Sequence, residues 1–134
     1  MLDFITPSKD LFAEAKQIQD FCQITPSDNP EEISARIVDC GIYVARTSKM
    51  IADAKYHLNL RLKDEAMEVI KKILADNKWS AKVQNSLIES ICKEERYLVD
   101  WLTELNKAVK YQFEAMRSLL SYEKEQMRSL AYQK

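Results

Sequence analysis

The sequence predicts an all-α protein, and three of its features carry that prediction. Gly occurs once and Pro three times in 134 residues, so the chain lacks the residues that usually form the tight turns of β-sheets. Hydrophobic residues make up 46% and charged residues 31%, a balance typical of a folded helical chain and not of a disordered one. Apolar residues also recur at alternating spacings of three and four. We therefore expect one helical domain over residues 1–134.

The first expected helix is short and covers about residues 7–21. Thr6 and Pro7 favour its start, because threonine caps free backbone N–H groups and proline at the first helical position has no N–H to leave unpaired. Apolar side chains share one side of this helix: Leu11, Ala15, Ile18 and Cys22. The helix therefore has a face to lay against the rest of the chain, and a linker over residues 22–29 follows it.

The second expected helix is long and covers about residues 30–76. Asn29 is suited to cap it, Pro30 to its first position, and two glutamates to its first turn. One heptad-like row runs through its first part: Ile33, Ile37, Cys40, Val44, Thr47, Ile51, Ala54 and Leu58. Such a row predicts packing against one long partner helix.

That partner is a third expected helix over residues 80–131, which follows a short turn and has Ser80 as its N-cap. Its row of side chains consists of Ile88, Ile91, Glu95, Leu98, Leu102, Leu105, Val109, Gln112, Met116 and Leu119. The second and third helices together therefore predict a long antiparallel hairpin that resembles a coiled coil.

A second row lies beside the first on the third helix and mixes aromatic with small residues. Its members are Tyr97, Trp101, Ala108, Tyr111, Ala115 and Tyr122. Two neighbouring rows need two contacts, whereas a hairpin supplies only one. We therefore expect this row to bind the N-terminal helix or other chains, and we expect a homo-oligomer in which several copies complete a helical bundle.

The formal net charge of −1 provides no overall field that would attract nucleic acid or an anionic membrane. The distribution of charge is uneven, because the first quarter of the chain is acidic and the middle is mildly basic. This asymmetry could support head-to-tail contacts between chains.

The expected location is a reducing cytoplasm. The three cysteines are an odd number without C-x-x-C spacing, so they favour free thiols. The N-terminus lacks the basic region and the apolar run of a signal peptide, and no stretch approaches the length of a transmembrane helix. We therefore expect a cytoplasmic protein with no membrane partner.

Folding the hairpin about its turn predicts a cluster of polar and aromatic side chains. The candidate ligand contacts in it are Lys55, Tyr56, His57, Arg96, Asp100 and Trp101. An aromatic ring could stack a base and a cationic side chain could hold a phosphate, which is the chemistry of a site for single-stranded nucleic acid or a nucleotide. The competing interpretation, which we favour, is a buried polar layer that sets the register of the two helices.

No pattern in the sequence predicts catalysis, a metal or a cofactor. His57 is the only histidine and has neither H-E-x-x-H nor Glu-x-x-His spacing around it. The single glycine excludes glycine-rich loops that cradle phosphates. We therefore expect a non-enzymatic protein that holds no metal and no cofactor.

Three segments carry a likeness to a known group: Ala52-Asp53-Ala54-Lys55-Tyr56-His57-Leu58-Asn59, Tyr97-Leu98-Val99-Asp100-Trp101, and the stretch from Lys93 to Arg128 with Leu105-Asn106 and Arg117-Ser118-Leu119-Leu120-Ser121. They resemble small helical proteins encoded by bacteriophages and prophages, over roughly the last two-thirds of the chain. The resemblance implies a viral protein in the cytoplasm of a bacterial host, at work in phage DNA recombination or replication or in host takeover. It implies no catalytic residues.

These observations together predict a non-enzymatic interaction protein that self-associates and binds another protein. The alternative is a protein that binds single-stranded nucleic acid or a nucleotide.

Overall fold

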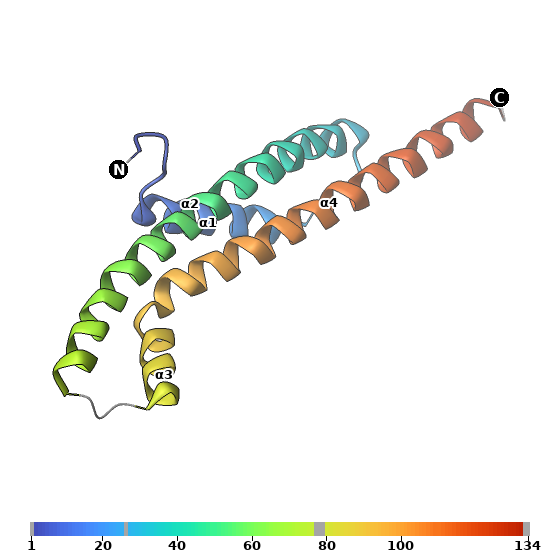
Figure 1. Cartoon of the computed structure of the whole chain (residues 1–134). Helices are drawn as coiled ribbons and strands as arrows, with labels where there is room; N and C mark the ends of the chain where they lie inside the picture. The colour runs from blue at the N-terminus through green and yellow to red at the C-terminus, as the bar shows by residue number, and fades with distance from the viewer. Residues whose placement is uncertain (1, 26, 77–79, 133–134) are drawn as a thin grey trace.

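The computed structural model describes residues 2–25, 27–76 and 80–132, and it contains four helices (Figure 1). They are α1 (Ser8–Cys22), α2 (Pro30–Asp76), α3 (Ala81–Ile91) and α4 (Lys93–Tyr132). No strand occurs in these described ranges. The prediction of an all-α chain is therefore confirmed, as are the positions of the first two helices.

Helices α2 and α4 pack side by side as an antiparallel hairpin, and α1 lies against both of them (Figure 1). The core residues come from all three of these helices: Leu11, Ala15, Ile18, Cys40, Met50, Ala54, Leu98, Leu102, Leu105 and Val109. The core therefore occupies the central part of the molecule, where three helices meet, and the predicted rows of α2 and α4 face inward there.

Two of the predicted caps are present. The Asn29 side-chain oxygen accepts the N–H of Glu31 at 2.9 Å, and the Ser80 hydroxyl accepts the N–H of Val83 at 3.3 Å. Thr6 does not cap α1, because Pro7 occupies the N-cap position and no side chain bonds there. The polar groups of Thr6 bind residues of α2 instead.

The expectation of one continuous helix over residues 80–131 needs correction, because the chain leaves the helical conformation at Cys92. The φ and ψ angles of Cys92 are −111° and 37°, and its carbonyl accepts the N–H of Arg96 at 3.0 Å, as the first bond of α4. Figure 1 shows why a break is useful: α2 curves, and α3 turns away from the axis of α4 to follow the far half of α2. Glu94 and Glu95 in the first turn of α4 are the sequence signal for this second start.

Candidate interaction surfaces

Helix α1 covers part of the second row of α4. The indole N–H of Trp101 donates to the side-chain oxygen of Gln19 at 3.1 Å. Farther along α4, the side-chain amide of Gln112 donates to the carbonyl of Cys22 at 2.7 Å. Docking of the N-terminal helix, one of the two roles expected for this row, is therefore observed around Trp101. Gln112 of α4 binds the last residue of α1.

The rest of that row stays open to solvent. Trp101 and Ala108 are half-buried, whereas Tyr97, Tyr111, Ala115 and Tyr122 are exposed. The Tyr97 ring lies beside the Trp101 ring, with 6.0 Å between the centroids. The predicted interface is therefore divided where α1 ends. Its residues up to Ala108 lie on the part of α4 beside α1, whereas Tyr111, Ala115 and Tyr122 lie on the part beyond it, which we call the free half of α4.

The C-terminal end of α4 extends past the start of α2 (Figure 1). Arg36 donates to the Gln112 side chain at 2.7 Å, and since the helices are antiparallel, the first turn of α2 lies about level with residue 118. The row of α4 side chains that packs on α2, which includes Val109, Phe113 and Met116, continues beyond this level through Leu120, Met127 and Leu130, with Glu123 as a charged interruption. Residues 124–132 are all exposed, with Met127 at 55% and Leu130 at 61%. We call residues 120–132 the α4 overhang.

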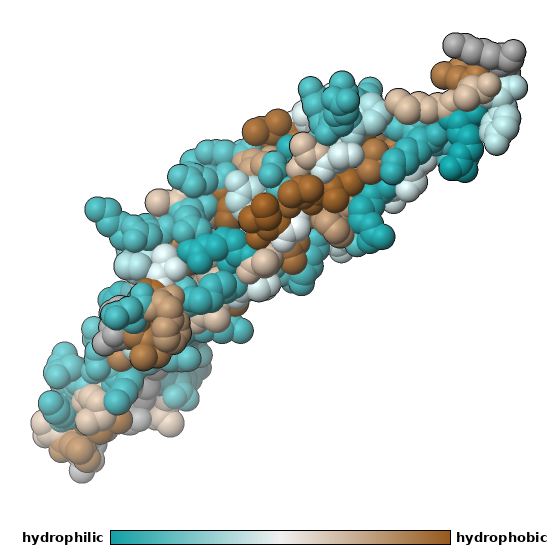
Figure 2. Space-filling view, turned by 90° about the horizontal axis from the view of Figure 1, so that it is seen from above, coloured by the Kyte–Doolittle hydropathy of each residue, from teal (hydrophilic) through white to brown (hydrophobic). Residues whose placement is uncertain are grey.

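A further apolar row lies on α2, on the side away from the core. Ala35, Val38, Ile42 and Ala45 are all exposed there, with Val38 at 61% and Ile42 at 60%. We call these four residues the outer row of α2. In the view from above, Figure 2 shows hydrophobic side chains gathered in an elongated patch near the middle of the molecule.

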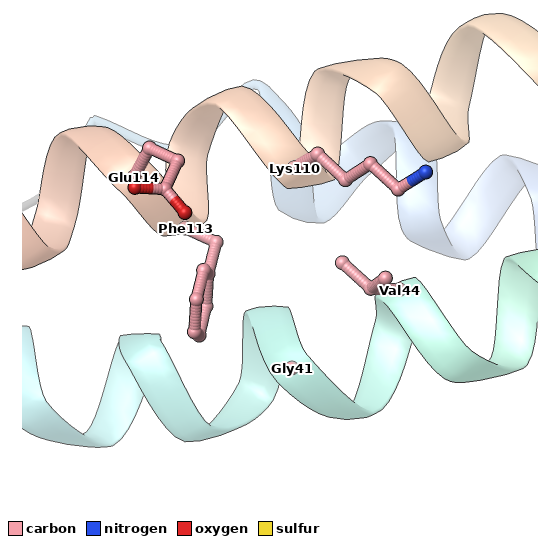
Figure 3. A pocket seen from close by; sticks show the side chains of 5 residues that line it. All are labelled: Gly41, Val44, Lys110, Phe113 and Glu114. Carbon is pink, nitrogen blue, oxygen red and sulfur yellow. The ribbon is translucent and has the colours of Figure 1, made fainter.

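Between α2 and α4, a hollow of ≈ 400 Å³ is lined by Gly41, Val44, Lys110, Phe113 and Glu114 (Figure 3). The Phe113 side chain points from α4 toward α2, near Gly41 (Figure 3). A Cβ added at Gly41 would lie 3.9 Å from the Phe113 ring, an ordinary van der Waals distance. Its lining carries only two charged side chains, Lys110 and Glu114, both exposed, so it offers an apolar wall and no buried polar group to orient a small ligand.

The candidate ligand contacts of the hairpin have separate partners. Lys55 and Asp100 are exposed, and Tyr56, half-buried, places its ring edge-on to His57 with 5.8 Å between centroids. His57 Nε2 lies 2.7 Å from the carbonyl oxygen of Thr6, and because a carbonyl only accepts, Nε2 carries the proton. Trp101 is bonded to α1, as described above.

Arg96, the remaining candidate contact, is half-buried, and its Nε has no hydrogen-bond partner among the described residues. None of the contacts found for these six side chains joins one of the α2 residues to one of the α4 residues.

The N-terminal segment is held by four side chains of α2, a set that the sequence reasoning missed. The backbone N–H of Thr6 donates to Asp53 at 3.1 Å, and Arg46 donates to the Thr6 hydroxyl at 3.1 Å. Lys49 donates to the Phe4 carbonyl at 2.9 Å and to the Asp53 carboxylate at 2.5 Å. Together with His57, these residues lie on one side of α2, and their spacing of three or four is the signal that could have identified them.

The hydrogen bonds at Asp53 also change its acidity. Burial alone would raise the pKa of Asp53, but hydrogen bonds from Lys49 and Thr6 and the positive charge of Lys49 outweigh burial and lower it. Asp53 is thus a buried carboxylate that stays ionised while it anchors Thr6.

A small cavity of ≈ 90 Å³ lies beside His57, and its lining includes Ser8, Phe12 and Glu95. Arg61 forms an ion pair with one oxygen of Glu95, while the other oxygen is buried and has no partner among the described residues. The buried Cys92 thiol is one helical turn away, and burial, together with the charge of Glu95, raises its pKa, so it stays protonated at neutral pH. This polar corner therefore has neither an activated nucleophile nor a cation-binding set of three or more His, Cys, Asp or Glu within the described part of the chain.

Among the described helices, none combines the length and the apolar character needed to cross a lipid bilayer. Comparisons of the chain with protein-family models, with curated proteins and with solved structures find no match.

Proposed function

We propose that the protein is a non-enzymatic helical interaction protein, which associates with a second copy of itself through the free half of α4 and binds another protein with its remaining surface. One observation carries this proposal. The apolar row that packs on α2 continues through the α4 overhang, where Met127 and Leu130 have no cover within the described chain.

The α4 overhang lacks the packing that stabilises the rest of α4. Its residues 120–132 span about 20 Å, and in proteins most of the stability of a helix comes from packing of its apolar face. A second helix laid along Leu120, Met127 and Leu130 would repeat the packing that α2 provides for the earlier part of the same row. A second copy can supply that helix, because its own overhang carries the same uncovered row.

Another face of α4 also carries side chains that suit an interface. Tyr111 and Tyr122 are exposed, and aromatic residues are enriched at protein interfaces because a large rigid ring is buried at low entropic cost. Methionine at position 127 adapts its shape to a partner. Tyr111, Ala115 and Tyr122, the second half of the predicted row, lie about 140° around the helix from Met127, so they suit the contact with the other protein.

Sedimentation equilibrium of the full chain and of two matched variants tests this proposal. Leu130→Glu puts a charge on the uncovered row and should lower the association constant about tenfold or more. Ser129→Glu adds the same charge on the neighbouring residue, which points about 100° away around the helix, and should change little. A full chain that stays monomeric at high micromolar concentration, or equal association of the two variants, would contradict the proposal.

The resemblance to proteins of bacteriophages and prophages supports a place for this activity in the cytoplasm of a bacterial host. There the partner protein would belong to phage DNA recombination or replication, or to host takeover. Affinity purification from infected cells, with the Leu130→Glu variant beside the parent chain, would identify partners that depend on the associated form.

A further inference from the structure

The outer row of α2 is bounded by two opposite charges. Glu31 lies four residues before Ala35, and Lys49 lies four residues after Ala45, so both fall on the same face of the helix as Val38 and Ile42. Glu31 is exposed, and 41% of the Lys49 side chain is accessible. Along this face, an acidic residue, four apolar residues and a basic residue therefore follow one another: Glu31, Ala35, Val38, Ile42, Ala45 and Lys49.

We propose that this face binds the same face of a second copy, with the two α2 helices antiparallel across a two-fold axis. Reversing the row places Glu31 opposite Lys49, Ala35 opposite Ala45, and Val38 opposite Ile42 of the other copy. Every position then meets a residue of matching size or opposite charge. Such self-complementarity is what a two-fold interface requires, because each residue must fit its counterpart twice.

The charges also decide the direction of the pairing. A parallel arrangement would place Glu31 beside Glu31 and Lys49 beside Lys49 of the second copy, and like charges in contact are unfavourable. The Lys49 ammonium has three donors, of which one binds the Phe4 carbonyl and one binds Asp53. The third can reach a carboxylate on a neighbouring chain.

Gly41 borders the outer row, and the packing within one chain does not require a glycine there. It is the only glycine in the protein and lies inside a helix of 47 residues, where glycine costs about 1 kcal/mol relative to alanine. A Cβ at this position would meet only the Phe113 ring, at 3.9 Å, so the chain's own packing does not exclude alanine. Gly41 is exposed on the flank of the outer row, about 80° around the helix from its centre and toward Phe113, and its missing side chain leaves that flank open to a second helix.

A matched pair of charge reversals tests the pairing. Glu31→Lys and Glu32→Lys both alter the first turn of α2 and weaken the same helix-dipole interaction, but only Glu31 lies on the outer row. Glu31→Lys should lower the association constant about tenfold, whereas Glu32→Lys should leave it near the parent value. Val38→Glu should lower the association constant further. Its control is Met67→Glu, because Met67 is also exposed but lies farther along α2. Equal effects within each pair would overturn the pairing.

Disulfide cross-linking tests its direction. In the antiparallel arrangement, full-length Ala35→Cys and Ala45→Cys proteins should form a mixed disulfide when combined and oxidised, because these positions face each other within the short distance between Cβ atoms that a disulfide needs. Neither variant should cross-link with itself, because its two copies would be separated by ten residues, about 15 Å along the helix. The parent chain under the same conditions controls for the native thiols. Self-linked dimers of each variant, or no mixed disulfide, would overturn the proposal.

The pairing through α2 rests on the proposed function and adds a second contact to the self-association through α4. Experiments can distinguish the failure of the α2 contact from the failure of the α4 contact. If both surfaces act, the full chain forms an assembly larger than a dimer, Leu130→Glu leaves the α2-linked dimer, and Val38→Glu leaves the α4-linked dimer. If only α2 pairs, Leu130→Glu changes nothing while the mixed disulfide still forms. If only α4 associates, the mixed disulfide is absent while Leu130→Glu still produces monomers, and the inference about α2 is overturned.

Discussion

Arg46 of α2 and Glu14 of α1 form an ion pair with two hydrogen bonds, at 2.7 Å from Nε and 2.6 Å from a terminal nitrogen. Arg46 also donates to Thr6, so one guanidinium joins α1, the N-terminal segment and α2. About a third of each side chain in the pair is exposed, so solvent screens the interaction. The pair therefore orients α1 more than it stabilises the protein.

Replacing either partner of this pair should loosen α1. We expect Glu14→Ala and Arg46→Ala each to lower the free energy of unfolding by about 1 kcal/mol, because solvent screens the charges. The double variant should lose less than the sum of the two, since each single change already removes the shared interaction. Urea unfolding followed by circular dichroism measures all three, and strictly additive losses would contradict a direct coupling.

Asn106 should set the register of the hairpin. Its side-chain amide is buried and donates to the hydroxyl of Thr47 at 2.8 Å, and it lies 3.2 Å from the Val44 carbonyl and from the Ser48 hydroxyl. Asn106→Ala removes these bonds from a buried site, although the Val44 carbonyl still accepts from the Thr47 and Ser48 hydroxyls, and should cost about 1 kcal/mol in unfolding free energy. Asn106→Leu should also permit alternative alignments of α2 and α4, which would appear as broadened side-chain resonances. A stable variant with sharp resonances would show that the amide has no such role.

Asp53 should make stability depend on pH on the acidic side. Its pKa is lower in the folded chain than its ordinary value, so the unfolded chain binds the proton more readily. The stabilisation is therefore complete above the unfolded pKa of about 4 and is lost as the pH falls through the folded pKa. Asp53→Asn should lose less stability than the parent chain across that window. Thermal melts at a series of pH values compare them, and parallel pH profiles would contradict the assignment.

Gly41→Ala separates the stability of one chain from its association. Because the added methyl group meets only the Phe113 ring at 3.9 Å, we expect it to raise the unfolding free energy of the chain by about 1 kcal/mol, through helix propensity. The same change should weaken the proposed α2 pairing. Denaturation at a concentration low enough to give monomers measures the first effect, and a less stable monomer would contradict this reading of the site.

Nucleic acid should have little effect on the environment of Trp101. The indole N–H is bonded to Gln19, and Trp101 is half-buried against α1, so its ring is not free to stack on a base. Titration of single-stranded oligonucleotides and nucleotides into a Trp79→Phe variant should therefore leave Trp101 fluorescence unchanged. A change that weakens steeply with added salt would instead support the nucleotide-binding alternative.

The sequence alone was sufficient to predict the elements of the hairpin, because their signals are local. Pro30 and Asn29 mark a helix start through the chemistry of the first turn, and the row from Ile33 to Leu58 is a periodicity within a single helix. The break at Cys92 was missed because the apolar spacing runs through it without interruption. Whether a helix bends there depends on the curvature of α2, which is a property of the partner and not of the local residues.

Which residues of a row are covered was decided only by the tertiary structure. The sequence predicted the row from Tyr97 to Tyr122 as one surface, but α1 ends beside Gln112 and divides it, and α4 outruns α2 and leaves Leu130 uncovered. Periodicity reports which side chains share a face, whereas burial depends on where each neighbouring helix begins and ends. The same holds for His57, whose partner, the Thr6 carbonyl, is 51 residues away in the chain and is brought close only by folding.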